Sequence, residues 1–437
     1  MIGALIAALL VFAFCAIASP FLGLIGVLGV IYVRPGEIYP DLAPLHIERI
    51  VSIVVMLAFV VRGNKLRFPK VTGALLFFWL AMFCSVPLSF WPGGAFQASL
   101  DFGKAIIYYL LIANLAITSQ RLRAILMAFC GMAGWLAGQA FVEYQQGATR
   151  FTMGIDRAIG LNNMSNDPNA LGITLVTTLP FIAIFCYRNA GRIRWLAMPL
   201  LGLCVWTIVL TGSRASYITL GVLSMLYALS SKQRIAGILA VFVLAGTLWA
   251  VMPAQYQDRL KTVNDLSADE SFQGRVAAWH VAWDMFKSNP LTGVGTTMFI
   301  DSRGAASGHW LNVHSLYFQI LAELGLLGTL AFGFFLFSIF QQNQRMRQEL
   351  EKLPDCPQWL SNFPRACNLA LIGLLVAGYS SHSLYRDTWY LLAGFSTAAI
   401  FVLRSEFSHL EAKPADQHVD AFAAYGTVDY VNARSTV

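Results

Sequence analysis

The sequence predicts an all-α, polytopic membrane protein with about 12 transmembrane helices and one large loop outside the cytoplasm. Two observations support this fold class. The chain has 437 residues, of which 57% are hydrophobic and only 12% are charged, whereas soluble domains carry about 25% charged residues. The apolar residues are also gathered into runs of roughly 17–25 residues, the length that an α-helix needs to cross a bilayer.

Thirteen apolar runs are candidate membrane spans. The first two contain no lysine or arginine and could form a hairpin that does not fully cross, so we expect 12 or 13 spans. The first run lacks a positively charged start, so we interpret it as a span and not as a secretory signal. The candidate spans are residues 2–18, 20–33, 47–62, 71–90, 104–118, 122–143, 168–187, 195–211, 215–230, 235–252, 316–340, 366–385 and 388–403.

Basic residues in the connecting loops predict the orientation, because cytoplasmic loops are enriched in lysine and arginine. Here they recur in every second loop, within residues 62–70, 121–123, 188–194, 232–234 and 345–365. We therefore place these loops in the cytoplasm and the long loop 253–315 outside it. The net charge of +7 follows from this anchoring pattern, so no nucleic-acid partner is expected.

This topology divides the chain into four parts. The expected parts are an N-terminal transmembrane bundle at residues 1–252, an extracytoplasmic loop with amphipathic helices at 253–315, C-terminal transmembrane helices at 316–404, and a cytoplasmic, disordered tail at 405–437. The seven cysteines fall in spans or cytoplasmic segments, which indicates no disulfide framework.

The loop 253–315 holds the first candidate site residue. Residues 272–289 are expected to form an amphipathic helix that ends at Asn289-Pro290, with Arg275, Trp279, Trp283 and Phe286 on one face. Indole rings favour the membrane interface. Arg275 then either reaches a lipid phosphate as a simple anchor, or binds a phosphate of a lipid-linked substrate through its bidentate guanidinium. The two glycines of Gly293-Val294-Gly295 allow a tight turn or the close approach of a ligand, and a plain loop is an equal alternative.

His314 lies where this loop enters the next span. A histidine is more often structural than catalytic, but a neutral imidazole can accept a proton from a hydroxyl group near neutral pH. The neighbouring Asn312 and Tyr317 could orient its ring or bind a sugar. We therefore predict His314 as a general base.

Two further cations are expected at the outer ends of spans. Arg214 links two spans with almost no loop, which fixes it at the membrane boundary; it either binds substrate or reaches lipid headgroups. Lys104 begins its span, and a topological anchor is the alternative to a substrate-binding role. Both are kept as candidate substrate-binding residues.

Loop 144–167 contributes Arg150, Arg157 and an amide-rich run. Asp167 is expected to cap the following helix, with Pro168 as its first residue. Asn169 is a candidate sugar-binding residue. No phosphate-binding glycine motif, zinc-type cluster or tight acidic pair is evident, so we expect no cofactor and no metal site. A bound pyrophosphate would then be neutralised by arginines.

Three stretches together resemble the O-antigen ligase and polymerase superfamily of bacterial membrane glycosyltransferases. They are Gly212-Ser213-Arg214-Ala215, the run from Gly274-Arg275 to Gly295, and the run from His314 to Gly328. The order and spacing of the last two, which flank one loop, make them specific. Many members carry asparagine after the histidine where this chain has Ser315.

The resemblance, closest to the O-antigen ligases, implies a helical fold of the GT-C-like type in the bacterial inner membrane, with the active site on the periplasmic face. It implies a donor glycan on undecaprenyl pyrophosphate, an acceptor such as the lipid A-core oligosaccharide of lipopolysaccharide, and contacts with membrane lipids. Arg214 and Arg275 would bind the donor pyrophosphate and His314 would be the general base. Displacement by an activated hydroxyl predicts inversion at the anomeric carbon.

Three alternatives remain open at this point. An O-antigen polymerase or a protein O-oligosaccharyltransferase of the same superfamily would use the same residues. A small-solute transporter would place ionisable residues and broken helices near the middle of the bilayer and would show internal repeats. The charges here gather at the outer ends of the spans and no repeat is evident, which favours the glycosyltransferase.

Overall fold

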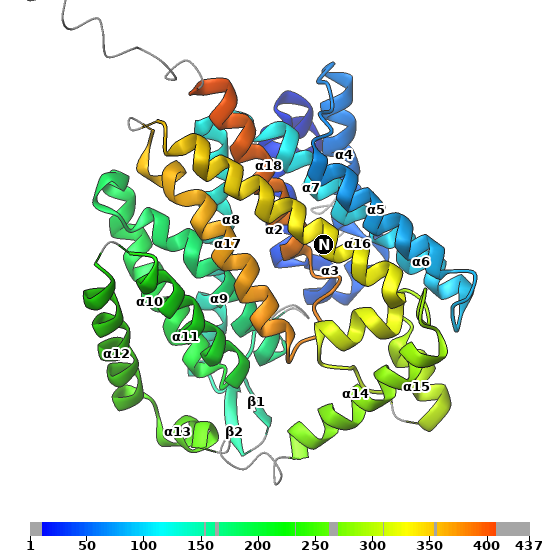
Figure 1. Cartoon of the computed structure of the whole chain (residues 1–437). Coiled ribbons are helices and arrows are strands. Elements are labelled where there is room, and N and C mark those ends of the chain that lie inside the picture. Colours follow the sequence, from blue (N-terminus) through cyan, green and yellow to red (C-terminus); the bar gives the residue numbers. More distant parts are fainter. Residues whose placement is uncertain are drawn as a thin grey trace, which may run out of the picture.

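The computed structural model describes residues 11–152, 154–161, 166–231, 233–261, 270–308, 310–353 and 356–407. Within these ranges the chain is mostly helical, with one two-stranded sheet. Apolar helices form the bundle in Figure 1: α2 (Pro20–Val33), α4 (Ile47–Val61), α5 (Lys70–Ser85), α7 (Gly103–Leu115), α8 (Ser119–Gln145), α9 (Pro168–Phe185), α10 (Arg194–Leu210), α11 (Arg214–Leu229), α12 (Arg234–Val251), α16 (Leu316–Leu350), α17 (Gln358–Gly378) and α18 (Asp387–Glu406).

Shorter elements connect these helices. They are α3 (Pro35–Ile38), the 3₁₀-helices η1 (Pro40–Leu45) and η2 (Arg188–Ile193), α6 (Pro92–Asp101), the strands β1 (Thr149–Thr152) and β2 (Ile155–Ala158), α13 (Ala254–Lys261), α14 (Glu270–Ser288) and α15 (Phe299–Ser307). The expected loop helix at 272–289 is therefore present as α14. We call the end of the bundle where α9, α11, α16 and α18 begin the loop end; β1, β2, α13 and α14 lie there, at the bottom of Figure 1.

The helix lengths define a multi-pass membrane protein, as predicted. Among the described residues, nine helices are long and apolar enough to cross a membrane, and α5 and α11 are shorter apolar helices. The start of the expected span 2–18 lies outside the described residues, so the count of 12 or 13 remains a prediction.

One expected span differs in an informative way. The run 366–385 was expected to be helical throughout, but α17 begins at Gln358, continues through Pro364 and ends at Gly378. Residues 379–386 instead form a loop. The serines of Ser380-Ser381-His382-Ser383 offer side-chain hydroxyls that compete for backbone hydrogen bonds, which disfavours a helix interior. This difference moves His382 from a span into a loop.

A glycine breaks α16 where another segment packs against it. Gly325 has φ +60, and a Cβ there would lie 2.6 Å from the carbonyl carbon of Leu291. The amide of Leu326 donates to the carbonyl oxygen of Pro290 at 2.8 Å, and the amide of Leu327 to that of Leu291 at 3.0 Å. The break therefore lets the segment after α14 form backbone hydrogen bonds with α16, and only glycine adopts this conformation at low cost.

The Gly293-Val294-Gly295 turn belongs to the same joint. Gly293 has φ +66, and a Cβ there would lie 2.4 Å from the carbonyl carbon of Glu323. The amide of Val294 donates to Ala322 at 2.8 Å. The lack of a side chain at Gly293 therefore lets this turn approach the backbone of α16 closely.

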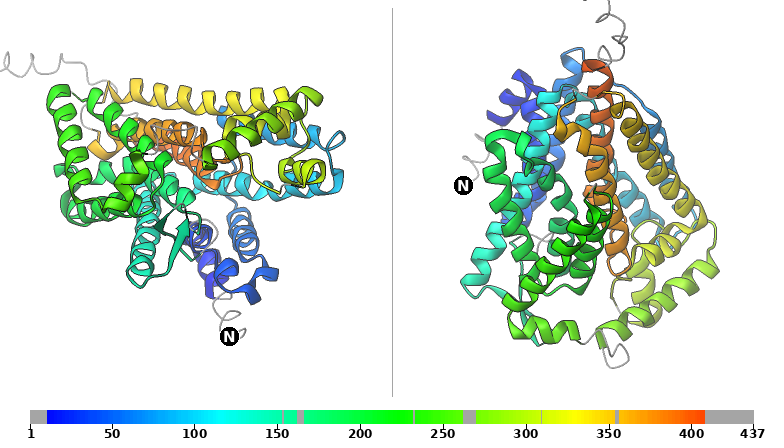
Figure 2. Two further views of the ribbon diagram at one scale, coloured as in Figure 1. Left: turned by 90° about the horizontal axis from the view of Figure 1, so that it is seen from below. Right: turned by 60° about the vertical axis from the view of Figure 1, so that its left-hand side comes forward.

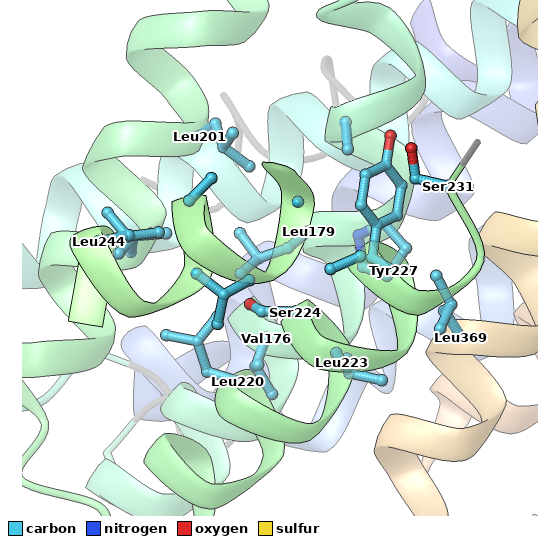
Figure 3. Close-up of a pocket in the computed structure, with 17 residues that line it drawn as sticks. Val176, Leu179, Leu201, Leu220, Leu223, Ser224, Tyr227, Ser231, Leu244 and Leu369 are labelled. Carbon is cyan, nitrogen blue, oxygen red and sulfur yellow. The ribbon is translucent and has the colours of Figure 1, made fainter. Parts of the chain in front are cut away.

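Helix α12 lies at the edge of the bundle and packs on α11 (Figures 1 and 2). None of its residues is buried. An apolar cavity of about 360 Å³ opens between α12 and the neighbouring α9, α10 and α11, with Leu369 of α17 as a further wall (Figure 3).

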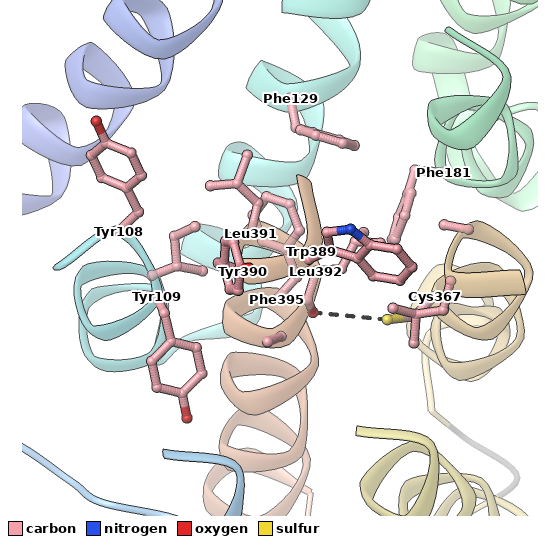
Figure 4. Packing of buried hydrophobic residues seen from close by; sticks show 14 of the residues in the cluster. Tyr108, Tyr109, Phe129, Phe181, Cys367, Trp389, Tyr390, Leu391, Leu392 and Phe395 are labelled. Atoms are coloured by element: carbon pink, nitrogen blue, oxygen red, sulfur yellow. Dashed lines mark hydrogen bonds between the residues drawn. The ribbon is translucent and has the colours of Figure 1, made fainter. Parts of the chain in front are cut away.

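Helix α18 is the centre of the core. It packs against α7, α8, α16 and α17, and Trp389, Tyr390 and Phe395 are fully buried (Figure 4). The indole N–H of Trp389 donates to the carbonyl oxygen of Ser383 at 2.9 Å, and the hydroxyl of Tyr390 to that of Leu384 at 2.8 Å. The polar groups of these buried aromatic side chains therefore donate hydrogen bonds to backbone carbonyls of the loop 379–386, and these bonds fix the loop to the bundle.

Candidate functional site

The hairpin β1–β2 positions a buried arginine at the loop end. Its strands are antiparallel, with Arg150 opposite Arg157 and Gly154 at φ +78 in the turn. Arg157 is only 4% exposed. Its Nε donates to the carbonyl oxygen of Thr211 at 2.7 Å and one terminal nitrogen donates to Oδ1 of Asn169 at 3.0 Å. Arg157 thus joins the hairpin to the start of α9 and to the turn before α11.

The start of α9 is capped as predicted. Asp167 accepts a hydrogen bond from the backbone amide of Asn169 at 2.8 Å, and Pro168 is the first helical residue. The amide groups of the first turn give this helix end a partial positive charge. It therefore adds to the positive potential of the arginines around it.

Trp279 fixes helix α14 against the start of α16. Its indole N–H donates to the carbonyl oxygen of Val313 at 3.1 Å. Its ring stacks on Phe318 with centroids 5.4 Å apart and meets Tyr379 edge-on at 5.3 Å. One turn earlier in α14 is Arg275. Anchoring of Trp279 beside Val313 therefore places Arg275 near His314. The second tryptophan of the helix, Trp283, is 44% exposed.

His314 is held in an uncommon backbone conformation, with φ +48. Its ring lies 5.2 Å from that of His382, centroid to centroid, at 76°. Burial lowers the pKa of His314, and the positive charges of Arg275 and Arg303 lower it further, while Asp167 opposes the change. The imidazole is therefore neutral at pH 7 and can accept a proton.

Arg303 and His382 complete the surroundings of His314. Arg303, on α15, is 6% exposed and donates to the carbonyl oxygen of Leu311 at 3.2 Å. Burial lowers the pKa of His382 to about 4, with His314 and Arg386 as further causes. Both histidines are thus uncharged at neutral pH, because charging either would add to an already positive environment.

His314 and Arg303 line a cavity of about 290 Å³, which we call the arginine cavity. Four arginines and one aspartate line it, so its formal charge is +3 with His314 neutral. Such a cavity suits a multiply charged anion. Its lining consists of Arg150, Thr152, Arg157, Asp167, Pro168, Asn169, Gly274, Arg275, Arg303, Leu311, Asn312 and His314.

The candidate residues from the sequence are only partly brought together. Arg275, His314, Asn169 and Asn312 all line the arginine cavity. Arg214 does not line it, although it begins α11 three residues after Thr211, the residue that Arg157 binds.

The other two candidates lie elsewhere. Tyr317 is 44% exposed, and its hydroxyl donates to the carbonyl oxygen of Leu375 at 2.9 Å. Lys104 lines a second cavity together with Arg34 and Asp387.

Sequence reasoning did not assign roles to Arg157, Arg303 or Asp167 at this cavity. A usable signal existed for the first: Arg157 follows three residues after Gly154, and a glycine between two short segments is typical of a hairpin turn. No comparable signal marks Arg303, because its position depends on how α15 folds back beside Leu311.

The start of α18 ties three elements to the site. The hydroxyl of Tyr385 donates to Glu323 of α16 at 2.7 Å. Arg386 donates to the hydroxyl of Thr174 in α9 at 2.9 Å, and Asp387 pairs with Arg34 at 3.3 Å. Three consecutive residues therefore connect α18 to α16, α9 and the end of α2, close to the arginine cavity.

In the part of the chain that the structure describes, no three His, Cys, Asp or Glu side chains come together as metal ligands. The positive charge at this site comes from arginines. The fold and the cavity define a class: a multi-pass helical membrane protein with an arginine-lined cavity at the ends of its helices, beside a neutral histidine.

One family model matches part of the chain. Residues 199–333 match the family model described as O-Antigen ligase, a stretch that contains Arg214, Arg275 and His314. This match over part of the chain supports the superfamily assignment that the sequence motifs predicted, and it supports a membrane glycosyltransferase of the O-antigen ligase or polymerase type. This family implies a lipid-linked glycan and membrane lipids as partners.

Among curated proteins, none matches the chain significantly. Among solved structures, it is similar to a chain described as "Structural coordination of polymerization and crosslinking by a peptidoglycan synthase complex". The identity is 16%, the TM-score is 0.42, and the match covers 76% of this chain and 98% of that chain. A similarity at this level has no bearing on the activity.

Proposed function

We propose that this protein transfers an O-antigen glycan from undecaprenyl pyrophosphate to the lipid A-core oligosaccharide, on the periplasmic face of the bacterial inner membrane. The observation that carries the proposal is the arginine cavity with the neutral His314 in its wall. Anion binding and base catalysis are the two tasks that such a transfer requires.

The arginines supply charge where the leaving group develops it. When the bond between the anomeric carbon and the pyrophosphate breaks, negative charge grows on the pyrophosphate oxygens. Arg157 and Arg303 are buried and fixed by hydrogen bonds to backbone carbonyls, so they are already oriented before the reaction. Preorganised donors of this kind stabilise the transition state in a poorly hydrated site.

His314 supplies the base. The acceptor hydroxyl oxygen attacks the anomeric carbon, its proton passes to the imidazole of His314, and undecaprenyl pyrophosphate leaves with the electron pair of the broken bond. A single displacement of this kind inverts the anomeric configuration. The lowered pKa of His314 keeps the proton acceptor available at neutral pH. The step requires no metal ion, because the cations of the site are guanidinium groups.

The proposal is tested with the whole protein, purified and reconstituted in lipid vesicles. Undecaprenyl-pyrophosphate-linked glycan and lipid A-core acceptor should give product in the presence of EDTA. His314→Ala should abolish transfer while the protein remains folded. Arg275→Gln and Arg157→Gln should each lower the rate by about 10²–10³, as for other preorganised donors.

A matched control is Arg347→Gln. Arg347 is exposed on α16 at the opposite end of the bundle, where it pairs with Glu351, so this variant should transfer at the wild-type rate. Product that forms only after a metal ion is added, or full activity of His314→Ala, would contradict the mechanism.

The acceptor is tested in cells, because an O-antigen polymerase would use the same residues. A deletion strain that accumulates long glycan on the lipid carrier identifies the ligase. A strain that attaches single repeats to lipid A-core identifies the polymerase instead.

A further inference from the structure

A second polar cavity, of about 160 Å³, lies at the loop end. It is bounded by the end of α2 and the starts of α4, α7 and α18. Its polar lining is Arg34, Glu37, Glu48, Lys104, Tyr108 and Asp387. We call it the carboxylate cavity, since it contains three carboxylates.

The charge of the carboxylate cavity is opposite to that of the arginine cavity. Three carboxylates and two cations give a formal charge of −1, against +3 in the arginine cavity. A pyrophosphate is therefore repelled from the former and attracted to the latter. The two cavities are suited to chemically different ligands.

Part of the carboxylate cavity is held rigid and part is open to a ligand. Arg34 pairs with Glu37 at 2.9 Å and with Asp387 at 3.3 Å, which fixes those carboxylates. Within the described residues, the side chains of Glu48 and Lys104 form no hydrogen bond or ion pair. An acceptor and a donor of hydrogen bonds therefore face the cavity together with unused bonding capacity.

The start of α18 lies between the two cavities. Asp387 lines the carboxylate cavity, and the adjacent Arg386 binds the carbonyl oxygen of Ala170 at 3.2 Å and Thr174 at 2.9 Å. Asn169, next to Ala170, lines the arginine cavity. Asp387 thus lines the carboxylate cavity, while Arg386 binds α9, the helix whose Asn169 lines the arginine cavity. This arrangement suits two substrates that must meet.

We propose that the carboxylate cavity binds a neutral or amine-bearing sugar of the acceptor glycan. Sugar hydroxyls donate hydrogen bonds to carboxylates and accept them from ammonium groups, so Glu48 and Lys104 offer both kinds of partner. The cavity has room for about one sugar ring. This inference rests on the proposed transfer, since it assigns the second substrate of that reaction.

The test measures binding directly and does not depend on turnover. The probe is delipidated lipid A-core oligosaccharide, titrated into the detergent-solubilised full-length protein by calorimetry without donor. Glu48→Gln and Lys104→Met should each weaken binding about ten-fold or more, as expected for the loss of a hydrogen bond to a charged group. The control is Arg49→Gln. Arg49 is the neighbour of Glu48 in the sequence, and its guanidinium pairs with Asp101 outside the cavity. This variant should bind the oligosaccharide as the wild type does.

Three results would overturn the assignment. They are wild-type affinity in both cavity variants, loss of oligosaccharide binding in Arg275→Gln instead, and Glu48-dependent binding of Mg²⁺, which would make the cavity a cation site. A protein that binds the oligosaccharide through Glu48 but gives no transfer in vesicles would contradict the proposed function and leave this site in place.

Discussion

At the scale of single residues, the protonation state of His314 follows from its neighbours. Arg275 and Arg303 disfavour a second positive charge, burial disfavours any charge, and Asp167 alone favours the imidazolium form. His314 thus has a pKa below its ordinary value, so catalysis by the neutral ring should be lost only as the pH falls below about 6.5. Arg275, which is proposed to bind the donor, thus also helps to keep the proposed base deprotonated.

Two substitutions should move the pKa of His314 in opposite directions. Arg275→Gln removes a repelling charge and should raise the pKa. Asp167→Asn removes an attracting charge and should lower it, while asparagine still caps α9. The pKa is measured by NMR titration of the protein with ¹³C-labelled histidine, with His314→Asn to assign the signal. A shift of the same sign in both variants would contradict this account.

At the scale of elements, the spans were predictable and the site was only partly so. Apolar runs such as those of α9 and α12 begin and end in the sequence where the helices do, because membrane insertion depends on local hydropathy. The loop 379–386 was missed because apolar residues lie on both sides of the short polar run Ser380-Ser381-His382-Ser383. Arg157 and Arg303 reach the arginine cavity through contacts with Thr211 and Leu311, and the hydropathy pattern contains no information on such pairings.

The break in α16 is an element-scale feature that can be tested within one helix. Gly325→Ala places a Cβ 2.6 Å from the backbone of Leu291 at φ +60, whereas a Cβ at Gly333 meets nothing within 4 Å. Gly325→Ala should therefore be destabilised, by about 1–3 kcal/mol if the strain is typical, and should separate the segment after α14 from α16. Gly333→Ala should be neutral or stabilised by up to about 1 kcal/mol.

The measurement is thermal unfolding of each variant in detergent, followed by transfer activity at a temperature where both are folded. We expect Gly325→Ala alone to lose activity, because the joint at Gly325 holds the loop that leads from Arg275 to His314. Equal melting temperatures for the two alanine variants would show that the break is not required.

At the scale of the whole molecule, the candidate site and the basic loops lie at opposite ends of the bundle. The arginine cavity and the carboxylate cavity both lie at the loop end. At the far end, Arg347 lies in the last turn of α16, Lys352 follows that helix, and Arg365 lies in the first half of α17. If the positive-inside rule governs insertion, both cavities face the periplasm, which is where a lipid-linked glycan and a lipid A-core acceptor would meet.

This orientation predicts which positions a membrane-impermeant thiol reagent reaches. Ala305, on α15, and Lys352, after α16, are both exposed and lie at opposite ends of the bundle. Ala305→Cys should be labelled in spheroplasts with an intact inner membrane, and Lys352→Cys only after the membrane is permeabilised. Inverted vesicles should give the reverse pattern, with the wild-type protein as the control for its seven native cysteines.

Labelling of Lys352→Cys in intact spheroplasts would place both cavities in the cytoplasm. Neither cavity could then meet an acceptor on the periplasmic side, and the proposed transfer would fail at this scale whatever the chemistry of His314.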